Sequence, residues 1–192
     1  MISAICGLAS PISTLSLIFL AISMSPWFSW TDNALSDLGV DGLPSVIFNS
    51  SLVIGGILMM IFAAGLKELA PNHVLARLGI WILILSSLAM CGIGLFPETA
   101  GRIHFFFSLA FFVLLQLSLL SLGTAMIIDS HRGKLGWFTF LLGILAIAPW
   151  AFHWRGVAIP ELTSSLAGTT WALIMGIRMI RKSSTSKSGH KL

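Results

Sequence analysis

Long apolar stretches, separated by short polar segments, divide the chain into six parts. Each stretch is about long enough, at 1.5 Å per residue, for a helix to cross a hydrocarbon layer of about 30 Å. Because main-chain groups in lipid must be hydrogen-bonded within the protein, such stretches favour helices. The predicted helices are approximately Ser3–Met24, Val46–Leu66, Leu78–Leu95, Ile103–Ile128, Leu135–Ala151 and Glu161–Ile180.

This pattern predicts an all-α fold, a polytopic integral membrane protein with a six-transmembrane-helix bundle. We expect a single transmembrane domain over residues 1–182 and a disordered basic cytoplasmic tail over residues 183–192. The first stretch has no Lys or Arg at its start and no clear cleavage site, so we expect a retained helix rather than a signal peptide. Pro11 would kink this helix or delay its beginning.

Composition supports the membrane interpretation. The chain is 56% hydrophobic and 9% charged, whereas a soluble domain carries about 25% charged residues. The basic residues lie at the ends of apolar stretches rather than on a soluble domain, which argues against nucleic-acid binding. Cys6 and Cys91 fall toward opposite faces of the predicted bundle, so we expect both to be free.

Basic residues are distributed unevenly between the two sides of the predicted bundle. Six crossings place both termini on one side with the second and fourth connections, and nine of the 11 Lys and Arg residues fall there. By the positive-inside rule, the termini are predicted to be cytoplasmic and the protein to be multi-pass in the cell membrane. The acidic residues on the opposite side are Asp32, Asp37, Asp41, Glu98 and Glu161.

The three outer connections carry ionisable residues at the edge of the hydrocarbon layer, where such groups are costly and usually paired or functional. A six-helix bundle would gather these connections at one end, so we predict a polar pocket open to the outside. Its expected walls are Trp27, Trp30, Trp150, Trp154 and the cluster Phe105, Phe106 and Phe107. Its candidate ligand-binding residues are Asp37, Glu98, Arg102, His104, His153, Arg155 and Glu161.

Other interpretations of these residues stay open. The charged residues would instead form interfacial salt bridges that tie the connections together. As catalytic candidates, Asp37, His104, His153 and Glu161 carry groups used in acid–base chemistry. His104, His153 and Glu98 are candidate Zn²⁺ ligands by donor type, although no His-Glu-x-x-His motif is present. The two histidines would also suit a bis-histidine haem, for which there is no further signal.

A stripe of small residues runs along the last predicted helix. Gly168, Ala172 and Gly176 recur every four residues, a pattern typical of close helix packing in membranes. We expect this face to support a homo-oligomer, and membrane lipids to be the other partners.

Several short motifs resemble a known family. They are Ala34 to Gly39 (ALSDLG), Ile47 to Asn49 opening a helix that contains Gly55 and Gly56, and Gly94 to Glu98 (GLFPE) followed by His104. Together they resemble domain-of-unknown-function family 998, a group of six-helix prokaryotic membrane proteins, from the first helix to about Ile180. The resemblance implies a multi-pass bundle and supplies no activity. The turn Ser36 to Gly39 is also similar, more weakly, to Frag1/DRAM/Sfk1 membrane proteins.

Three functions are compatible with these observations. The first is a binding or regulatory membrane protein whose pocket accepts a lipid headgroup or small amphiphile. The second is a membrane-embedded hydrolase acting on a lipid, with or without a metal-activated water. The third is a small-molecule transporter, which is weakened because the two halves show no matched broken helices, although Pro11 and the pair Gly55-Gly56 are potential breaks.

Overall fold

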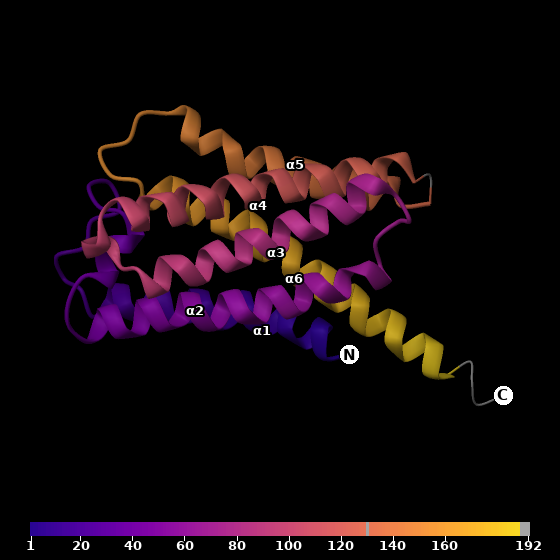
Figure 1. Cartoon of the computed structure of the whole chain (residues 1–192), viewed down its shortest axis with the longest axis horizontal. Helices are drawn as coiled ribbons and strands as arrows, with labels where there is room; N and C mark the ends of the chain where they lie inside the picture. Colours follow the sequence, from indigo (N-terminus) through magenta and orange to yellow (C-terminus); the bar gives the residue numbers. More distant parts are fainter. Residues whose placement is uncertain (130, 189–192) are drawn as a thin grey trace.

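The computed structural model describes residues 1–129 and 131–188, which form helices and their connections (Figure 1). Short 3-10 segments occupy parts of the connections: η1 (Leu35–Gly39), η2 (Leu66–Glu68), η3 (Glu98–Ala100) and η4 (Ala148–Ala151). The α-helices are α1 (Ile2–Ser23), α2 (Gly42–Gly65), α3 (Val74–Leu95), α4 (Arg102–Ile128), α5 (Gly133–Ile147) and α6 (Ala158–Ser188).

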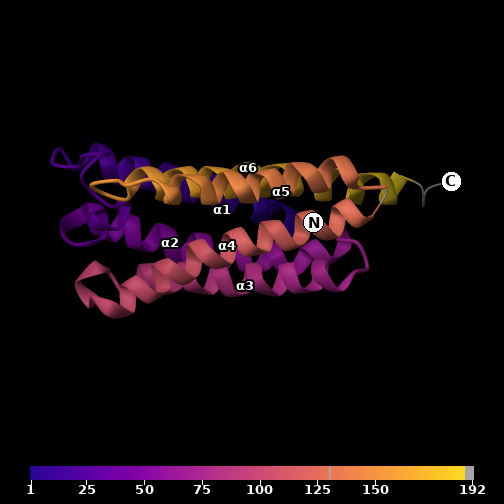
Figure 2. The ribbon, with the colours of Figure 1, turned by 90° about the horizontal axis from the view of Figure 1, so that it is seen from above.

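Among the described residues, 5 helical segments are long and apolar enough to cross a membrane: α1, α2 with η2, α3, α4, and α5 with η4. Helix α6 is outside this set because Ser and Thr interrupt its apolar positions and its last turns are basic. It nevertheless runs along the bundle in contact with α1 and α5 (Figures 1 and 2). The predicted all-α polytopic membrane fold is confirmed.

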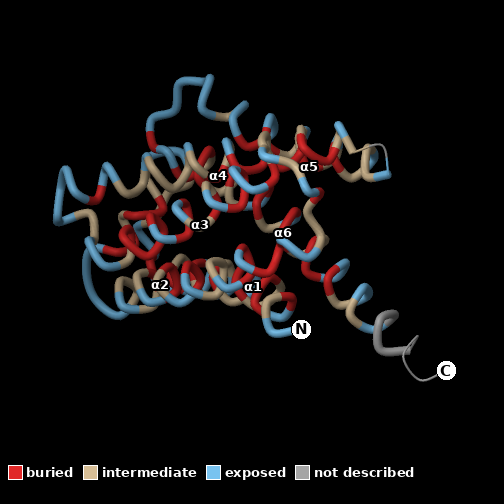
Figure 3. Tube along the Cα trace, turned by 45° about the vertical axis from the view of Figure 1, so that its right-hand side comes forward, coloured by how far each residue is buried: buried red, intermediate tan, exposed pale blue. Residues whose placement is uncertain are grey.

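The outward faces of the helices carry large apolar side chains. Trp81, Leu88 and Phe106 are 66%, 54% and 64% exposed. Figure 3 shows buried residues along the inner sides of the helices and exposed residues over much of the connections. A soluble monomer rarely exposes so extensive an apolar surface. Lipid is therefore the solvent that suits these faces.

Consecutive helices are neighbours from α1 to α5, and α6 closes the bundle against α1 and α5. Trp171 of α6 is fully buried at the centre, with its ring centroid 5.8 Å from that of Phe62. Its indole N–H donates to the hydroxyl of Thr139 at 3.1 Å, so its polar atom has a partner inside the core. Buried serines likewise bond neighbouring helices, as Ser118 of α4 does to the carbonyl of Gly79 at 2.8 Å.

The small-residue stripe of α6 packs inside the chain. Gly168 faces Leu115 of α4, Ala172 is fully buried, and Gly176 faces the carbonyl of Ala4 in α1. The homo-oligomer that we expected to form through this face would therefore require the bundle to open, because the close approach that small residues permit is already made by α1 and α4.

Some helix ends differ from the predicted ones. Helix α1 begins at Ile2 and contains Pro11 within it, so the proline does not delay the helix. Helix α6 continues to Ser188, beyond the predicted end of the transmembrane domain at residue 182. Residues 189–192 of the predicted tail lie outside the described residues. Cys6 and Cys91 are both free and buried, as expected.

The connections gather at two ends of the bundle. The acidic end holds the α1–α2, α3–α4 and α5–α6 connections, at the left of Figure 1. The basic end, at the right, holds the α2–α3 and α4–α5 connections and the end of α6. This arrangement agrees with the predicted alternation of six helices and brings the three outer connections together.

We expect Gly56→Ala to destabilise the bundle, because a Cβ atom there would lie 2.5 Å from Cys91 Sγ and 2.7 Å from the main-chain oxygen of Ser87. Overpacking of this kind costs roughly 1–3 kcal/mol. Thermal unfolding in detergent measures the effect. Gly133→Ala is the control, since no atom lies within 4 Å of a Cβ at that position. Equal unfolding midpoints for both variants would contradict the close contact between α2 and α3.

Candidate functional site

The first connection at the acidic end is held in shape by its own side chains. Asp37 Oδ2 accepts hydrogen bonds from the Ala34 amide at 3.0 Å and from Asn33 Nδ2 at 2.6 Å. Asn33 Oδ1 in turn accepts from the Ser29 amide at 2.9 Å. Asp37 therefore caps η1, which satisfies an amide at the start of that segment.

This connection is docked on the start of α6. Glu161, in the first turn of α6, is 7% exposed and accepts from the Leu35 amide at 2.7 Å. The amides of Gly156 and Ala158 donate to main-chain carbonyls of the first connection at 2.8 and 2.9 Å. A Cβ at position 156 would lie 2.3 Å from the Asn33 oxygen, so this close approach requires glycine. The first and third connections are thus joined through their main chains.

Three carboxyl groups from three segments form the carboxylate cluster: Asp37 of η1, Glu98 of η3 and Glu161 of α6. Asp37 and Glu98 lie close enough to Glu161 to act on it electrostatically. Burial raises the pKa of Glu98 and the Asp37 carboxylate raises it further, while the Ser36 hydroxyl opposes the shift. Glu98 Oε2 is buried and has no hydrogen-bond partner among the described residues. The cluster thus retains an unused acceptor.

A cavity of about 560 Å³, here called the acidic-end pocket, lies beside this cluster between α4, η4 and the start of α6. Its polar groups come from Ser36, Glu98, His104, Ser108, Gln116 and Glu161. Its apolar walls are formed by Phe105, Leu109, Phe112, Val113, Trp150 and Val157. A pocket of this kind combines a polar end with an apolar length, which suits an amphiphilic molecule.

One wall of the pocket belongs to the outer face of α4. Phe105, Leu109 and Val113 are 61%, 49% and 43% exposed although they line the cavity. The pocket therefore opens sideways, along a surface that faces lipid, as well as toward the connections.

His104 and Ser108 form a hydrogen-bonded pair on the pocket wall. His104 is 7% exposed, its Nδ1 lies 2.9 Å from the Phe96 carbonyl oxygen, and its Nε2 lies 3.2 Å from Ser108 Oγ. Because a carbonyl oxygen only accepts, Nδ1 carries a hydrogen. In the neutral imidazole, Nε2 then accepts from the Ser108 hydroxyl. This is the polarity in which a histidine acts as a base toward a serine.

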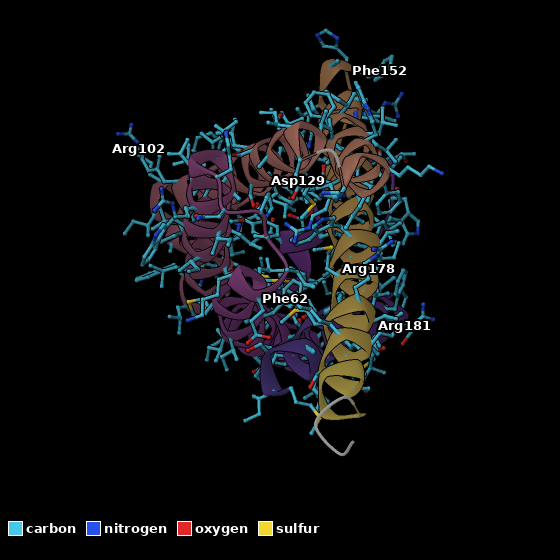
Figure 4. The ribbon with its side chains drawn as sticks, turned by 90° about the vertical axis from the view of Figure 1, so that its right-hand side faces the viewer. Phe62, Arg102, Asp129, Phe152, Arg178 and Arg181 are labelled. Carbon is cyan, nitrogen blue, oxygen red and sulfur yellow. The ribbon has the colours of Figure 1, made fainter. Side chains whose placement is uncertain are left out.

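The predicted ligand set divides into two groups. Asp37, Glu98, His104 and Glu161 gather at or beside the pocket. The other three predicted residues do not line the cavity in the described structure. Arg102 points away from the bundle (Figure 4), His153 is exposed, and Arg155 lies 3.7 Å from Asp32 with 86% of its side chain exposed. Long cationic side chains on loops reach water, where their charge is best solvated.

Of the predicted aromatic walls, Trp150 and Phe105 line the pocket in the described structure. The Trp150 indole N–H donates to Ser164 Oγ at 2.9 Å, which fixes the ring against α6. The other aromatic residues pack against different rings or are exposed: Trp27, Trp30, Trp154, Phe106 and Phe107.

Among the described residues, no group of three His, Cys, Asp or Glu is placed to hold a metal ion. Of the predicted Zn²⁺ ligands, Glu98 and His104 line the pocket, but His153 is exposed outside it. Both ring nitrogens of His104 already have partners. Of the two histidines considered for a haem, His104 lines the pocket and His153 does not.

Two serines of the pocket were not among the predicted site residues. Ser108 follows His104 by four residues, a spacing that places both on one helix face, so the sequence contained this signal. Ser36 enters the pocket because η1 docks on α6, and no local pattern indicates that docking. Gln116, in the middle of α4, makes an interhelical hydrogen bond, because its side-chain amide donates to the Ala146 carbonyl of α5 at 3.0 Å.

A family model described as a protein of unknown function (DUF998) matches residues 8–178. This match reaches from within α1 to within α6, and it confirms the family that the sequence motifs resemble. No curated protein and no solved structure matches the chain. The weaker similarity to Frag1/DRAM/Sfk1 proteins therefore receives no support.

We expect thermal stability in detergent to fall with rising pH more steeply in the wild type than in Glu98→Gln. The pKa of Glu98 is raised above its ordinary value of 4.5. Such a carboxyl contributes stability that is fully present below its unfolded pKa and is lost as pH rises through the higher folded pKa. Glutamine cannot ionise. The unfolding midpoint measured across a pH series gives the change of stability with pH for each protein. The exposed Glu68→Gln is the control. Equal changes with pH in the wild type and both variants would contradict the expectation.

Proposed function

The chain belongs to the DUF998 family, whose function is unknown, and we propose from its own geometry that it binds an amphiphile in the acidic-end pocket. The headgroup of this ligand is an amine or another strong hydrogen-bond donor, and its apolar chain lies along α4. The observation that carries the proposal is the buried Glu98 Oε2, which has no hydrogen-bond partner among the described residues.

The charge of the pocket supports this ligand class. Glu98 and Glu161 line the cavity, whereas the two arginines of the acidic end, Arg102 and Arg155, do not. Buried carboxylates without a cationic partner are costly, and a cationic or hydrogen-bond-donating headgroup would remove that cost. An anionic headgroup would be repelled. The carboxylate cluster therefore favours an amine over a phosphate or sulfate.

The apolar part of the pocket supports an amphiphile rather than a small polar molecule. Phe105, Leu109 and Val113 connect the cavity to the lipid-facing surface of α4. Burying apolar surface there contributes roughly 25 cal/mol per Å². A ligand with a chain gains this contribution and a free polar amine does not.

We also propose that the acidic end faces the outside of the cell membrane and that both termini are cytoplasmic. The support is the asymmetry of basic residues, since nine of the 11 Lys and Arg residues belong to the opposite end or to the C-terminal segment. The ligand would then come from the outer leaflet.

The proposal predicts that dodecylamine binds the purified protein more tightly than dodecanol does, and that Glu98→Gln removes most of this difference. Hydrogen bonds to charged groups contribute about 1.5–3 kcal/mol, so the affinity for dodecylamine should fall roughly 10- to 100-fold. Titration calorimetry in a neutral detergent measures both ligands.

The matched control is Glu68→Gln, which removes the same charge from an exposed residue at the basic end. Its affinity for dodecylamine should equal that of the wild type. Equal affinities for the amine and the alcohol, or equal losses in the two variants, would overturn the proposal.

A second candidate function is hydrolysis of a lipid ester, which the His104–Ser108 pair favours. In this reaction, Ser108 Oγ attacks the ester carbonyl carbon while its proton passes to His104 Nε2. The bond from carbon to the alcohol oxygen breaks, and that oxygen takes the proton from His104. Water then attacks the acyl-serine by the same route and releases the acid. Of the other catalytic candidates, Asp37 and Glu161 accept main-chain hydrogen bonds and His153 is exposed.

A fluorophosphonate probe tests this second candidate, because it reacts covalently with activated serines. Labelling should map to Ser108 by mass spectrometry and disappear in Ser108→Ala. A histidine acting as general base contributes about 100-fold or more, so His104→Gln should slow labelling by at least that factor. Ser121→Ala on the same helix is the control, since Ser121 bonds the Leu75 carbonyl away from the pocket. An unlabelled wild type would exclude the hydrolase.

A further inference from the structure

A second polar cavity lies at the basic end, opposite the carboxylate cluster. Its volume is about 880 Å³, and three parts of the chain line it: Leu69, which follows η2, the α4–α5 connection with the first turn of α5, and α6 over Arg178 to Lys182. Figure 1 shows α6 sloping away from the start of α5 toward its C-terminal end. We call this cavity the basic-end pocket.

Cations dominate this lining. The residues that carry or can carry positive charge are His131, Arg132, Lys134, Arg178, Arg181 and Lys182, and the described lining contains no Asp or Glu. Figure 4 looks onto this end and labels Asp129 of the α4–α5 connection and Arg178 and Arg181 of α6. Positive side chains that gather from distant segments repel one another, and an anion bound between these side chains offsets the repulsion.

One acidic side chain and one main-chain carbonyl compensate this charge in part. Asp129 pairs with Arg132 at 3.0 Å, and the Glu68 main-chain oxygen accepts a hydrogen bond from Lys182 Nζ. Lys134 and Arg178 are both exposed residues of the lining. They come from α5 and α6, so an anion between the two helices would meet both.

The start of α5 adds to the positive potential. Its N-cap residue is Arg132, whose side chain makes no capping hydrogen bond. The amides of an uncapped first turn and the positive end of the helix dipole favour an anion. Basic side chains from two other segments converge on this turn, so the anion site does not depend on the helix end alone.

We propose that the basic-end pocket binds a phosphate group presented by the headgroup of an anionic membrane lipid. Leu69 and Leu135 line the cavity beside the cations, so a lipid phosphate would lie against charge with its glycerol region against apolar surface. Part of the lining lies next to the start of α5, a helix long and apolar enough to cross a membrane, and lipid phosphates lie where such helices leave the hydrocarbon layer. This site is separate from the acidic-end pocket and does not depend on the function proposed for it.

Native mass spectrometry of protein taken from nanodiscs of phosphatidylcholine with phosphatidylglycerol tests the proposal. The wild type should retain phosphatidylglycerol in preference to phosphatidylcholine. The double variant Lys134→Gln, Arg178→Gln should bind phosphatidylglycerol at least about 10-fold more weakly, since each basic residue near an anionic surface contributes roughly fivefold. The charge-conserving double variant Lys134→Arg, Arg178→Lys should keep the preference.

The control is the double variant Lys67→Gln, Arg77→Gln, which removes two exposed basic residues of the same end that do not line the cavity. Equal losses in the two glutamine variants would show a general basic surface and overturn the proposal. A competition experiment with inorganic phosphate and glycerol 3-phosphate distinguishes a lipid phosphate from a soluble one. If either displaces phosphatidylglycerol at comparable concentration, the pocket is a site for soluble phosphates and the lipid assignment is wrong.

Discussion

The buried hydrogen bond from the Leu35 amide to the Glu161 carboxylate positions the polar end of this membrane protein. Both groups have left water, so each requires the other to avoid the cost of an unpaired buried polar atom. Glu161 also lies in the first turn of α6, where the helix dipole favours a carboxylate. With η1 held on α6 in this way, Asp37 lies beside Glu98 and the carboxylate cluster forms.

The two ends of the bundle concentrate charges of opposite sign. At the acidic end, carboxyl groups from three segments meet beside an apolar wall. At the basic end, cations from the α4–α5 connection, the start of α5 and α6 line a larger cavity. Like charges gather against their mutual repulsion in both places, and a ligand of opposite charge would relieve that repulsion. A bilayer supplies amines and phosphates on headgroups attached to apolar chains, and these are the ligands that we propose for the two cavities.

The polar pocket could be predicted in part. Glu98, His104 and Glu161 follow or precede apolar stretches at the same end, so alternation of the helices brings them together. Arg155 and His153 have the same position in the sequence pattern but lie in a loop whose side chains reach water. The spacing of four residues places Ser108 and His104 on one face of α4, but the tertiary structure decided that this face turns toward the pocket. The small-residue stripe of α6 indicated close packing without indicating its partner, which proved to be the rest of the same chain.

The sequence by itself determined the membrane class, the number of helices and the separation of charge between the ends. These properties depend on the length of apolar stretches relative to the bilayer and on the order of charges along the chain, and both are local. Tertiary structure decided which ionisable groups meet. That outcome depends on contacts such as the one between Leu35 and Glu161, which lie 126 residues apart, and on the rotation of each helix about its axis. No repeating pattern along the chain encodes these long-range contacts or these helix rotations, because the packing of all six helices together selects them.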